Sequence, residues 1–264
     1  MPKPFFLIAL ISFLFLGVFG CEKDVSVTAE SAILMSPLTK RIVYSKDPHL
    51  RLLPASTVKV MTALTVLKKS HIGKKAVVSK LASSMEPSKV YIEEGEVYFT
   101  EDLLKALLLN SGNDASVALA ESVAGSEEGF VNMMNDMAKA TGARDTNFTN
   151  SNGLPAKDQY STAYDLALIV RTAMRDKRFI DIMKTKRSEI EEIKSGRRIK
   201  LKNHNKSLWK DKSYSIFGKT GYTKKARHCF AGYIEYNRWR RVIVVILKSK
   251  KIWSDLEALA ESLL

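Results

Sequence analysis

The chain has 264 residues, of which 45% are hydrophobic and 27% are charged. This composition is normal for a globular protein with a real core, and the length suits one large domain or two small ones. The net charge of +14 suggests a polyanionic neighbour, such as nucleic acid, anionic lipid or an acidic envelope polymer. The basic residues are spread over the second half without a nucleic-acid-binding motif, so we expect a solvated basic surface and no nucleic-acid partner.

The N-terminal segment predicts export. Lys3 precedes an apolar run over residues 5–19, which has about the length of a secretory signal and is short for a membrane-spanning helix. The run ends at Val18-Phe19-Gly20-Cys21 and resembles a bacterial lipoprotein signal, in which the cysteine is lipidated and becomes the new N-terminus, although the bulky Phe19 departs from that pattern. Residues 1–20 are expected to be a signal peptide. Lipidation of Cys21, ordinary cleavage near Gly20 and an uncleaved anchor stay open, and each places the chain in the periplasm or on the outer face of the cytoplasmic membrane.

Cysteines and histidines point to no metal or disulfide chemistry. The two cysteines are Cys21 and Cys229, and lipidation of the first leaves the second without a partner. The four histidines show no metal-ligand spacing, so no metal and no cofactor are expected.

The first part of the chain predicts two strands followed by a mainly helical region. Thr100-Glu101-Asp102 is a helix start with an acidic first turn, Asp114 is expected to cap the next helix, Gly142 closes another, and Thr162–Asp165 is a capping box. The expected strands are 32–35, 41–44, 74–79 and 97–99, and the expected helices are 56–69, 100–109, 115–123, 130–140 and 162–174.

The last part predicts a return to strands. Ser195-Gly196 is expected to be the turn of a hairpin between 190–193 and 198–201, followed by strands 215–217, 229–235 and 241–247 and a closing helix 252–264. Strands at both ends with helices between them predict an α+β fold, in which an antiparallel sheet from the N- and C-terminal strands is covered by helices beside a central helical region. We expect one domain over residues 25–264.

Ser56 and Lys59 form the first candidate catalytic pair. Residues i and i+3 lie on one face of a helix, so the hydroxyl and the amine can share a pocket. Serine is a weak nucleophile until a base takes its proton, and a desolvated lysine with a depressed pKa can be that base. Alone, this spacing is more often a helix cap beside a solvated lysine.

Two later motifs are individually weak as well. Ser111-Gly112-Asn113 lies between two expected helices, where it is either an ordinary turn or a pair of polar side chains facing a cleft. Lys219-Thr220-Gly221 can bind a substrate carboxylate, and its glycine lets a substrate backbone approach closely, but it also suits an ordinary strand end.

Together the three motifs resemble a known set. Ser-x-x-Lys, Ser-x-Asn and Lys-Thr-Gly in this order are similar to the motifs of penicillin-binding proteins and β-lactamases, where the middle motif is often Ser-Asp-Asn. The sequence resembles the low-molecular-mass penicillin-binding proteins of the D-alanyl-D-alanine carboxypeptidase family, over nearly all of the mature chain. Further matching stretches are Asn147-Phe148, Asn152-Gly153-Leu154, residues 160–165, residues 203–206 and Tyr222-Thr223.

The resemblance implies a β-lactamase/transpeptidase-like fold and a role for each motif. Ser56 attacks the penultimate D-alanine of a peptidoglycan stem peptide with Lys59 as its base, and Ser111 is a candidate to protonate the leaving amine. The implied substrate-binding residues are Asn113, Lys219, Thr220 and Gly221. The oxyanion hole is expected to use backbone N–H groups of Ser56 and of a residue on the strand after Gly221, such as Cys229 or His228. β-Lactams are expected to acylate Ser56.

Some features depart from the family. An arginine that often binds the carboxylate near the final strand is missing, and Lys248 or a neighbouring lysine either replaces it or the contact is lost. The C-terminal β-domain and amphipathic helix of many relatives are not expected here. Alternatives are a DD-endopeptidase, a serine β-lactamase and a non-catalytic envelope-binding protein. Against the β-lactamase, we expect no deacylating glutamate in a Glu-x-x-x-Asn context between Asn113 and Lys219.

Overall fold

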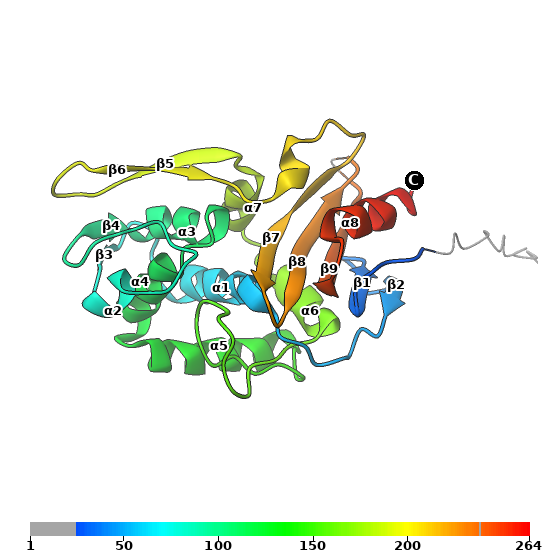
Figure 1. Cartoon of the computed structure of the whole chain (residues 1–264), viewed down its shortest axis with the longest axis horizontal. Coiled ribbons are helices and arrows are strands. Elements are labelled where there is room, and N and C mark those ends of the chain that lie inside the picture. The colour runs from blue at the N-terminus through cyan, green and yellow to red at the C-terminus, as the bar shows by residue number, and fades with distance from the viewer. Residues whose placement is uncertain (1–24, 238) are drawn as a thin grey trace, which may run out of the picture.

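The computed structural model describes residues 25–237 and 239–264, and Figure 1 shows its sheet beside a helical region. The sheet has five antiparallel strands in the order β2-β1-β9-β8-β7. These strands are β1 (Ser31–Met35), β2 (Ile42–Lys46), β7 (Ser215–Thr223), β8 (Arg227–Glu235) and β9 (Arg241–Ser249). The N-terminal hairpin therefore joins the three C-terminal strands, as the sequence predicts.

Alternating side chains divide the hydrophobic core between the two faces of the sheet. On one face, Ile33, Val245 and Leu247 pack with the helices α1 (Lys59–Lys69) and α6 (Ala163–Ala173). On the other, Leu34 and Val244 pack under α8 (Ile252–Glu261). Because successive residues of a strand point to opposite faces, the near-continuous apolar sequence of β9 serves both clusters.

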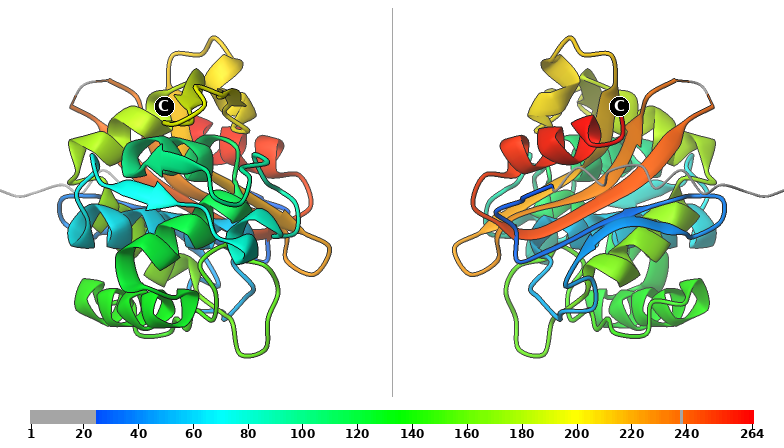
Figure 2. Two further views of the ribbon diagram at one scale, coloured as in Figure 1. Left: turned by 90° about the vertical axis from the view of Figure 1, so that its left-hand side faces the viewer. Right: turned by 90° about the vertical axis from the view of Figure 1, so that its right-hand side faces the viewer.

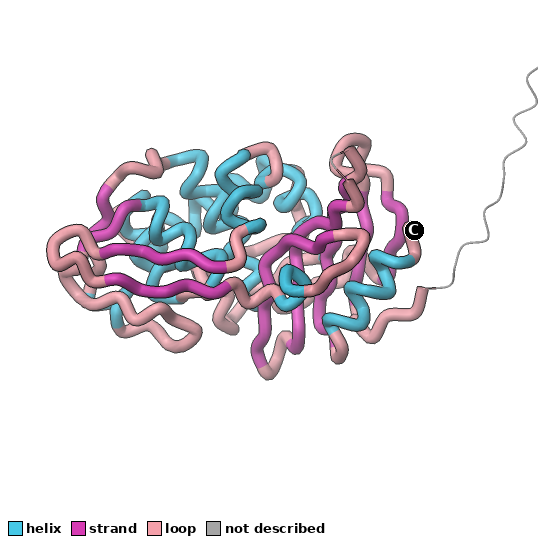
Figure 3. The backbone as a smooth tube through the Cα atoms, turned by 90° about the horizontal axis from the view of Figure 1, so that it is seen from above, coloured by secondary structure: helices cyan, strands magenta, loops and turns pink. Residues whose placement is uncertain are grey.

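The helical region surrounds α1, which is buried along most of its length. Figure 3 shows the strands of the main sheet gathered at one end of the molecule, together with the C-terminal helix, and most other helices, with a long hairpin across them, at the other end. The elements of this region are η1 (Ala55–Val58), α2 (Lys80–Ser83), α3 (Thr100–Leu109), α4 (Asn113–Ala124), α5 (Glu127–Thr141), α7 (Lys177–Lys184), η2 (Lys206–Trp209) and the hairpins β3 (Lys75–Val77)–β4 (Val97–Phe99) and β5 (Arg187–Glu191)–β6 (Arg198–Lys202).

Two local expectations are corrected and one short helix is added. The helix that was expected to begin at 130 begins at Glu127, because the Ser126 hydroxyl accepts from the Gly129 amide and caps it. The short helix α7 was not predicted. Asp114 is not a cap: α4 begins at Asn113, and the Asp114 carboxylate instead binds the amides of Val90 and Ile92. Within the described ranges, no helix combines the length and apolarity needed to cross a bilayer.

Candidate active site

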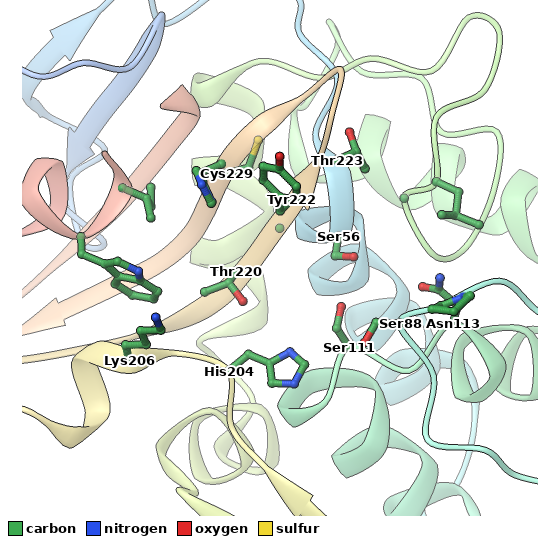
Figure 4. Close-up of a pocket in the computed structure, with 17 residues that line it drawn as sticks. Ser56, Ser88, Ser111, Asn113, His204, Lys206, Thr220, Tyr222, Thr223 and Cys229 are labelled. Atoms are coloured by element: carbon green, nitrogen blue, oxygen red, sulfur yellow. The ribbon is translucent and has the colours of Figure 1, made fainter. Parts of the chain in front are cut away.

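A pocket of about 320 Å³ lies where η1, the start of α4 and the strand β7 meet. Ser56, Ser111, Asn113, Thr220 and Gly221 all line it, so the fold brings the three sequence motifs to one place. Figure 4 shows the hydroxyls of Ser56, Ser111 and Thr220 directed into this pocket. Lys59 and Lys219 lie beneath it with side chains that are almost fully buried.

Ser56 lies in the short helix η1, immediately before α1 begins at Lys59. The residue before it, Ala55, has a positive φ of 48°, a conformation that β-carbon crowding makes rare outside glycine. The serine is therefore presented at a sharp bend rather than at the regular helix start that we expected. Such backbone outliers persist where the surrounding structure over-determines them.

Lys59 is the centre of the hydrogen-bond network. Its Nζ lies 3.1 Å from Ser56 Oγ, 2.6 Å from Asn113 Oδ1 and 2.6 Å from the carbonyl oxygen of Asn152. Burial lowers the pKa of Lys59 well below its ordinary value, the charge on Lys219 lowers it further, and Asp114 partly opposes both. A neutral amine within hydrogen-bond reach of a serine hydroxyl can accept its proton.

The Asn152 carbonyl reaches Lys59 because hydrogen bonds of the neighbouring residue Ser151 hold its loop in place. The carbonyl of Ser151 accepts hydrogen bonds from Thr62 (2.5 Å) and Ser116 (2.7 Å), and the Ser151 hydroxyl donates to Glu127. Gly153 follows at a φ of 87°, and an added Cβ would lie 2.0 Å from the Ala55 carbonyl oxygen. This close approach explains why glycine occupies that position in the Asn-Gly-Leu stretch.

Asn113 has one donor left for a substrate. Its Oδ1 accepts from Lys59 and its Nδ2 donates to the Glu86 carbonyl at 2.8 Å, so one of the two N–H bonds of the amide stays available. Ser111 sits at a φ of 61° and is buried, with its hydroxyl turned toward the Ser56 side of the pocket. Both residues therefore line the same pocket as Ser56.

Lys219 is 1% exposed, and its Nζ lies 2.8 Å from the Thr220 carbonyl oxygen. Burial lowers the pKa of Lys219 to about 7. Its charge is thus poised near neutral pH, and an anion bound in the pocket would stabilise the ammonium form.

Gly221 lines the pocket and also lies against the backbone of η1. An added Cβ would lie 2.8 Å from the Ser56 backbone nitrogen and 3.2 Å from that of Thr57. The glycine therefore lets η1 pack closely against β7, and its expected contact with a substrate backbone stays a prediction.

The expected second oxyanion donor is also corrected. Cys229 and His228 lie on β8, where they pair with Gly221 and Tyr222 of β7. β8 is an interior strand of the sheet, one strand further from Ser56, whereas β7 is the edge strand that contacts η1. Because the outer side of an edge strand carries unpaired N–H groups, β7 and not β8 is placed to supply this donor.

Two basic residues of the pocket wall, His204 and Lys206, were noted in the sequence without a role. Asn205 fixes their loop by donating to the Ile216 carbonyl at 2.8 Å, and the His204 amide donates to the Leu109 carbonyl. Partial desolvation of the His204 ring and the charge on Lys219 lower the pKa of His204, so the ring is neutral at pH 7. The only sequence signal was the Asn-His-Asn-Lys stretch itself.

Lys248 does not replace the missing arginine. Its Nζ pairs with Glu30 at 3.0 Å, and the residue lines a different depression. A Glu-x-x-x-Asn spacing does occur, at Glu128 and Asn132, but both residues are exposed on α5 and neither lines the pocket. Within residues 25–237 and 239–264, no three potential metal ligands lie together.

A serine hydroxyl with a buried amine beside it, and a second lysine on a neighbouring edge strand, is an arrangement that suits serine acyl transfer. The chain belongs to the D-alanyl-D-alanine carboxypeptidase family, whose profile matches residues 19–251. The family assignment made from the motifs is confirmed.

Relatives and solved structures agree with this assignment. D-alanyl-D-alanine carboxypeptidase DacF of Bacillus subtilis is 35% identical over 224 residues, which is 82% of this chain and 57% of that protein. The chain thus spans little more than half the length of this relative, whereas it covers 70% of DacB2 of Mycobacterium tuberculosis at 33% identity.

Among solved structures, the D-alanyl-D-alanine carboxypeptidase of Mycobacterium tuberculosis superposes with a TM-score of 0.82 at 28% identity, covering 90% of this chain and 91% of that chain. A mutant of the Streptomyces K15 DD-transpeptidase gives 0.82 at 27% identity, covering 90% and 97%. The penicillin-binding fold predicted from the sequence is confirmed.

Proposed function

We propose that the protein is a serine-type D-alanyl-D-alanine carboxypeptidase, which removes the terminal D-alanine from pentapeptide stems of peptidoglycan. The observation that carries the proposal is the position of Ser56 Oγ, 3.1 Å from a buried lysine amine whose pKa is lowered, in a pocket that Thr220 also lines. The neighbour of Thr220, Lys219, is buried beside this pocket. Membership of the family supports the same reaction.

The reaction follows from these positions. Lys59 takes the Ser56 proton while Oγ bonds to the carbonyl carbon of the penultimate D-alanine. The C–N bond then breaks, and the leaving amine receives a proton, for which Ser111 lines the path. Water afterwards adds its oxygen to the acyl carbon, and Ser56 Oγ regains a proton as the shortened stem leaves.

Lys219 and Thr220 hold the terminal carboxylate in this scheme. A bound carboxylate raises the pKa of Lys219 from its free value of about 7, so the ammonium is retained. That charge disfavours protonation of Lys59, so substrate binding also keeps the base neutral.

Mass analysis of a muropeptide that ends in D-Ala-D-Ala tests the proposal, with Ser56→Ala as the matched variant. The expected result is loss of one alanine with the parent protein and none with the variant. Equal loss in both proteins, or no loss in either, would overturn the role assigned to Ser56.

A second candidate reaction is acyl transfer to an amine, because the fold matches a protein named DD-transpeptidase as closely as it matches a carboxypeptidase. Adding a glycine-terminated acceptor peptide to the same assay separates the two. A product that joins stem and acceptor indicates transfer, whereas cleavage of cross-linked dimers alone indicates an endopeptidase. Rapid turnover of penicillin without either product indicates a β-lactamase.

The protein is also proposed to be exported and held at the membrane by its N-terminal segment, which lies outside the described residues. The apolar run and Cys21 support this proposal. Mass spectrometry of the mature N-terminus tests it: a diacylglyceryl group on Cys21 indicates a lipoprotein, and a free residue near 21 indicates ordinary cleavage. An intact Met1 indicates an uncleaved anchor.

A further inference from the structure

Two large apolar side chains lie exposed side by side, away from the active-site pocket. Trp239 and Leu38 are 85% and 84% exposed, more than any other large apolar residue that the structure describes. Both line one depression, together with Pro37 and Met174. Scattered apolar residues on a surface need no explanation, but grouped ones mark a contact site.

The fold brings these side chains together from distant parts of the sequence. β1 pairs with β9 so that Met35 lies opposite Ile243, which places the turn after β1 beside the turn before β9. Arg171 of α6 then fixes the first turn, because its Nε donates to the Pro37 carbonyl at 2.7 Å. We call this surface, formed by the two turns and the C-terminal end of α6, the arginine-rich face.

The charge of this face is one-sided. Of the residues that the structure describes, Arg171, Arg175 and Arg241 line its depression and no acidic residue does, although Arg241 also pairs with Glu235 beside it. Lys40, Arg41 and Arg240 extend the exposed cationic surface along the two turns. Exposed tryptophan and leucine among arginines match the chemistry of a bilayer surface, where aromatic rings lie at headgroup depth and cations meet anionic lipid.

The arginine-rich face points away from the active site. Gly221 pairs with Cys229 near one end of β8, whereas the arginine-rich face begins after Glu235 at the other end. Six residues of strand separate the two ends by about 20 Å. Figure 2 shows the β1–β2 and β8–β9 turns on one side of the molecule and the β7–β8 turn on the other.

An N-terminal anchor, whether a lipid on Cys21 or an uncleaved segment, would hold this face near a membrane. The apolar run ends at residue 19, and residues 20–24 span at most about 18 Å before Val25. The Val25 carbonyl accepts a hydrogen bond from Tyr44 on β2, at 3.2 Å, so the β1–β2 hairpin is attached directly to the start of the described chain.

We infer that the arginine-rich face rests on an anionic phospholipid surface, with Leu38 and Trp239 at the depth of the headgroups. In this orientation the pocket opens away from the bilayer, toward the layer where stem peptides lie. The contact rests on the proposed membrane attachment: it orients an enzyme that is tethered by a lipid on Cys21 or by an uncleaved anchor.

Tryptophan quenching in vesicles tests the inference on the full chain. The protein is reconstituted into phosphatidylglycerol–phosphatidylcholine vesicles whose acyl chains carry bromine, which quenches nearby tryptophan emission. Its tryptophans are Trp209, Trp239 and Trp253. The expected result is strong quenching of the parent, loss of most of that quenching in Trp239→Phe, and its retention in the matched variant Trp209→Phe. Undiminished quenching in Trp239→Phe, or none in the parent, overturns the inference.

A second variant tests whether the positive charge of the arginine-rich face contributes to binding. Arg175→Glu in the same vesicles is expected to reduce Trp239 quenching, and phosphatidylcholine alone is expected to do the same to the parent. Quenching that stays the same in Arg175→Glu and in phosphatidylcholine vesicles contradicts an anionic partner. A parent that is unquenched and sediments as a dimer shows that the face binds a second copy instead. Release of D-alanine is measured in parallel, since these variants leave the pocket intact and a failure there concerns the proposed reaction.

Discussion

At the scale of single residues, the site depends on two lysines that the protein keeps nearly free of water. Lys59 and Lys219 approach the pocket from a helix and from an edge strand, and burial lowers the pKa of both. Burying each lysine costs stability at any pH at which the unfolded chain carries the ammonium charge, because the folded interior disfavours that charge. The proposed chemistry needs this burial, because it requires a neutral amine at Lys59 beside the serine and a charge at Lys219 that changes near neutral pH.

The burial of Lys219 predicts how the free energy of unfolding varies with pH. Between pH 7, the folded pKa of Lys219, and its ordinary value of 10.5, the unfolded chain binds more protons, so the parent becomes more stable as pH rises. Lys219→Met lacks this gain. Urea unfolding at pH 7.5 and 9.5 should show the parent improving relative to the variant by about 2–3 kcal/mol over these two units. Parallel changes in both proteins would contradict a depressed pKa at Lys219.

Gly221→Ala tests the contact between strand and nucleophile. The new Cβ would lie 2.8 Å from the Ser56 nitrogen, so η1 has to move. Misplacement of a nucleophile by about 1 Å can cost roughly 100-fold in rate, and we expect a fall of that order in kcat/KM for release of D-alanine.

Gly73→Ala is the matched control for this change, because its Cβ would meet only the flexible His71 ring. It should leave kcat/KM unchanged. Full activity of Gly221→Ala would show that this close approach is not needed to position Ser56.

At the scale of elements, Asp114 connects α4 to the loop that forms one wall of the pocket. Its carboxylate accepts from the amides of Val90 at 2.9 Å and Ile92 at 3.3 Å. In Asp114→Ala these buried N–H groups lose their acceptor, which costs about 1–3 kcal/mol for each group. Hydrogen exchange should therefore speed up at Val90 and Ile92.

Asp136→Ala is the control for that experiment. Asp136 is exposed and lies 3.7 Å from Lys139 on α5, and exposed pairs of this kind contribute little. Its removal should leave exchange at Val90 and Ile92 unchanged. Equal exchange in the Asp114 variant and the parent would mean that other contacts hold the loop.

Elements with strong local signals were predictable from the sequence. Thr162 accepts from the Asp165 amide as its capping box predicts, and Gly142 ends α5 in the left-handed conformation. β7 was expected only over 215–217, because its Lys-Thr-Gly end lacks the apolar alternation that marks a strand and is held instead by pairing with β8.

The sequence motifs also predicted which side chains meet in one pocket. The contacts that hold these side chains in place were not predictable. Asp114 was expected to cap a helix because nothing local reveals that a loop 22–24 residues earlier binds it. His204, Lys206 and Asn152 belong to stretches that resemble the family, but no local pattern shows that they reach the site, because tertiary packing brings them there.

At the scale of the whole molecule, the pocket joins two parts of the fold. Lys219, Thr220 and Gly221 come from the sheet, while Ser56, Lys59 and Asn113 come from the helical region. A ligand bonded to Ser56 and held by Thr220 would therefore connect the two parts.

This arrangement predicts that benzylpenicillin stabilises the protein against heat. A group that binds only the folded state raises the midpoint of unfolding, and for a chain of this size each 1 kcal/mol corresponds to roughly 2–4 °C. Calorimetry should show that treatment with benzylpenicillin raises the Tm of the parent and leaves the Tm of Ser56→Ala unchanged. A rise in both would indicate binding that does not involve Ser56.

The central claim is that Ser56 is the nucleophile. The most direct measurement treats the protein with benzylpenicillin, digests it and locates the adduct by mass spectrometry. The account predicts one penicilloyl group, on the peptide that contains Ser56 and on that side chain. An adduct on Ser111, or release of D-alanine by a protein that never forms an adduct at Ser56, would contradict it.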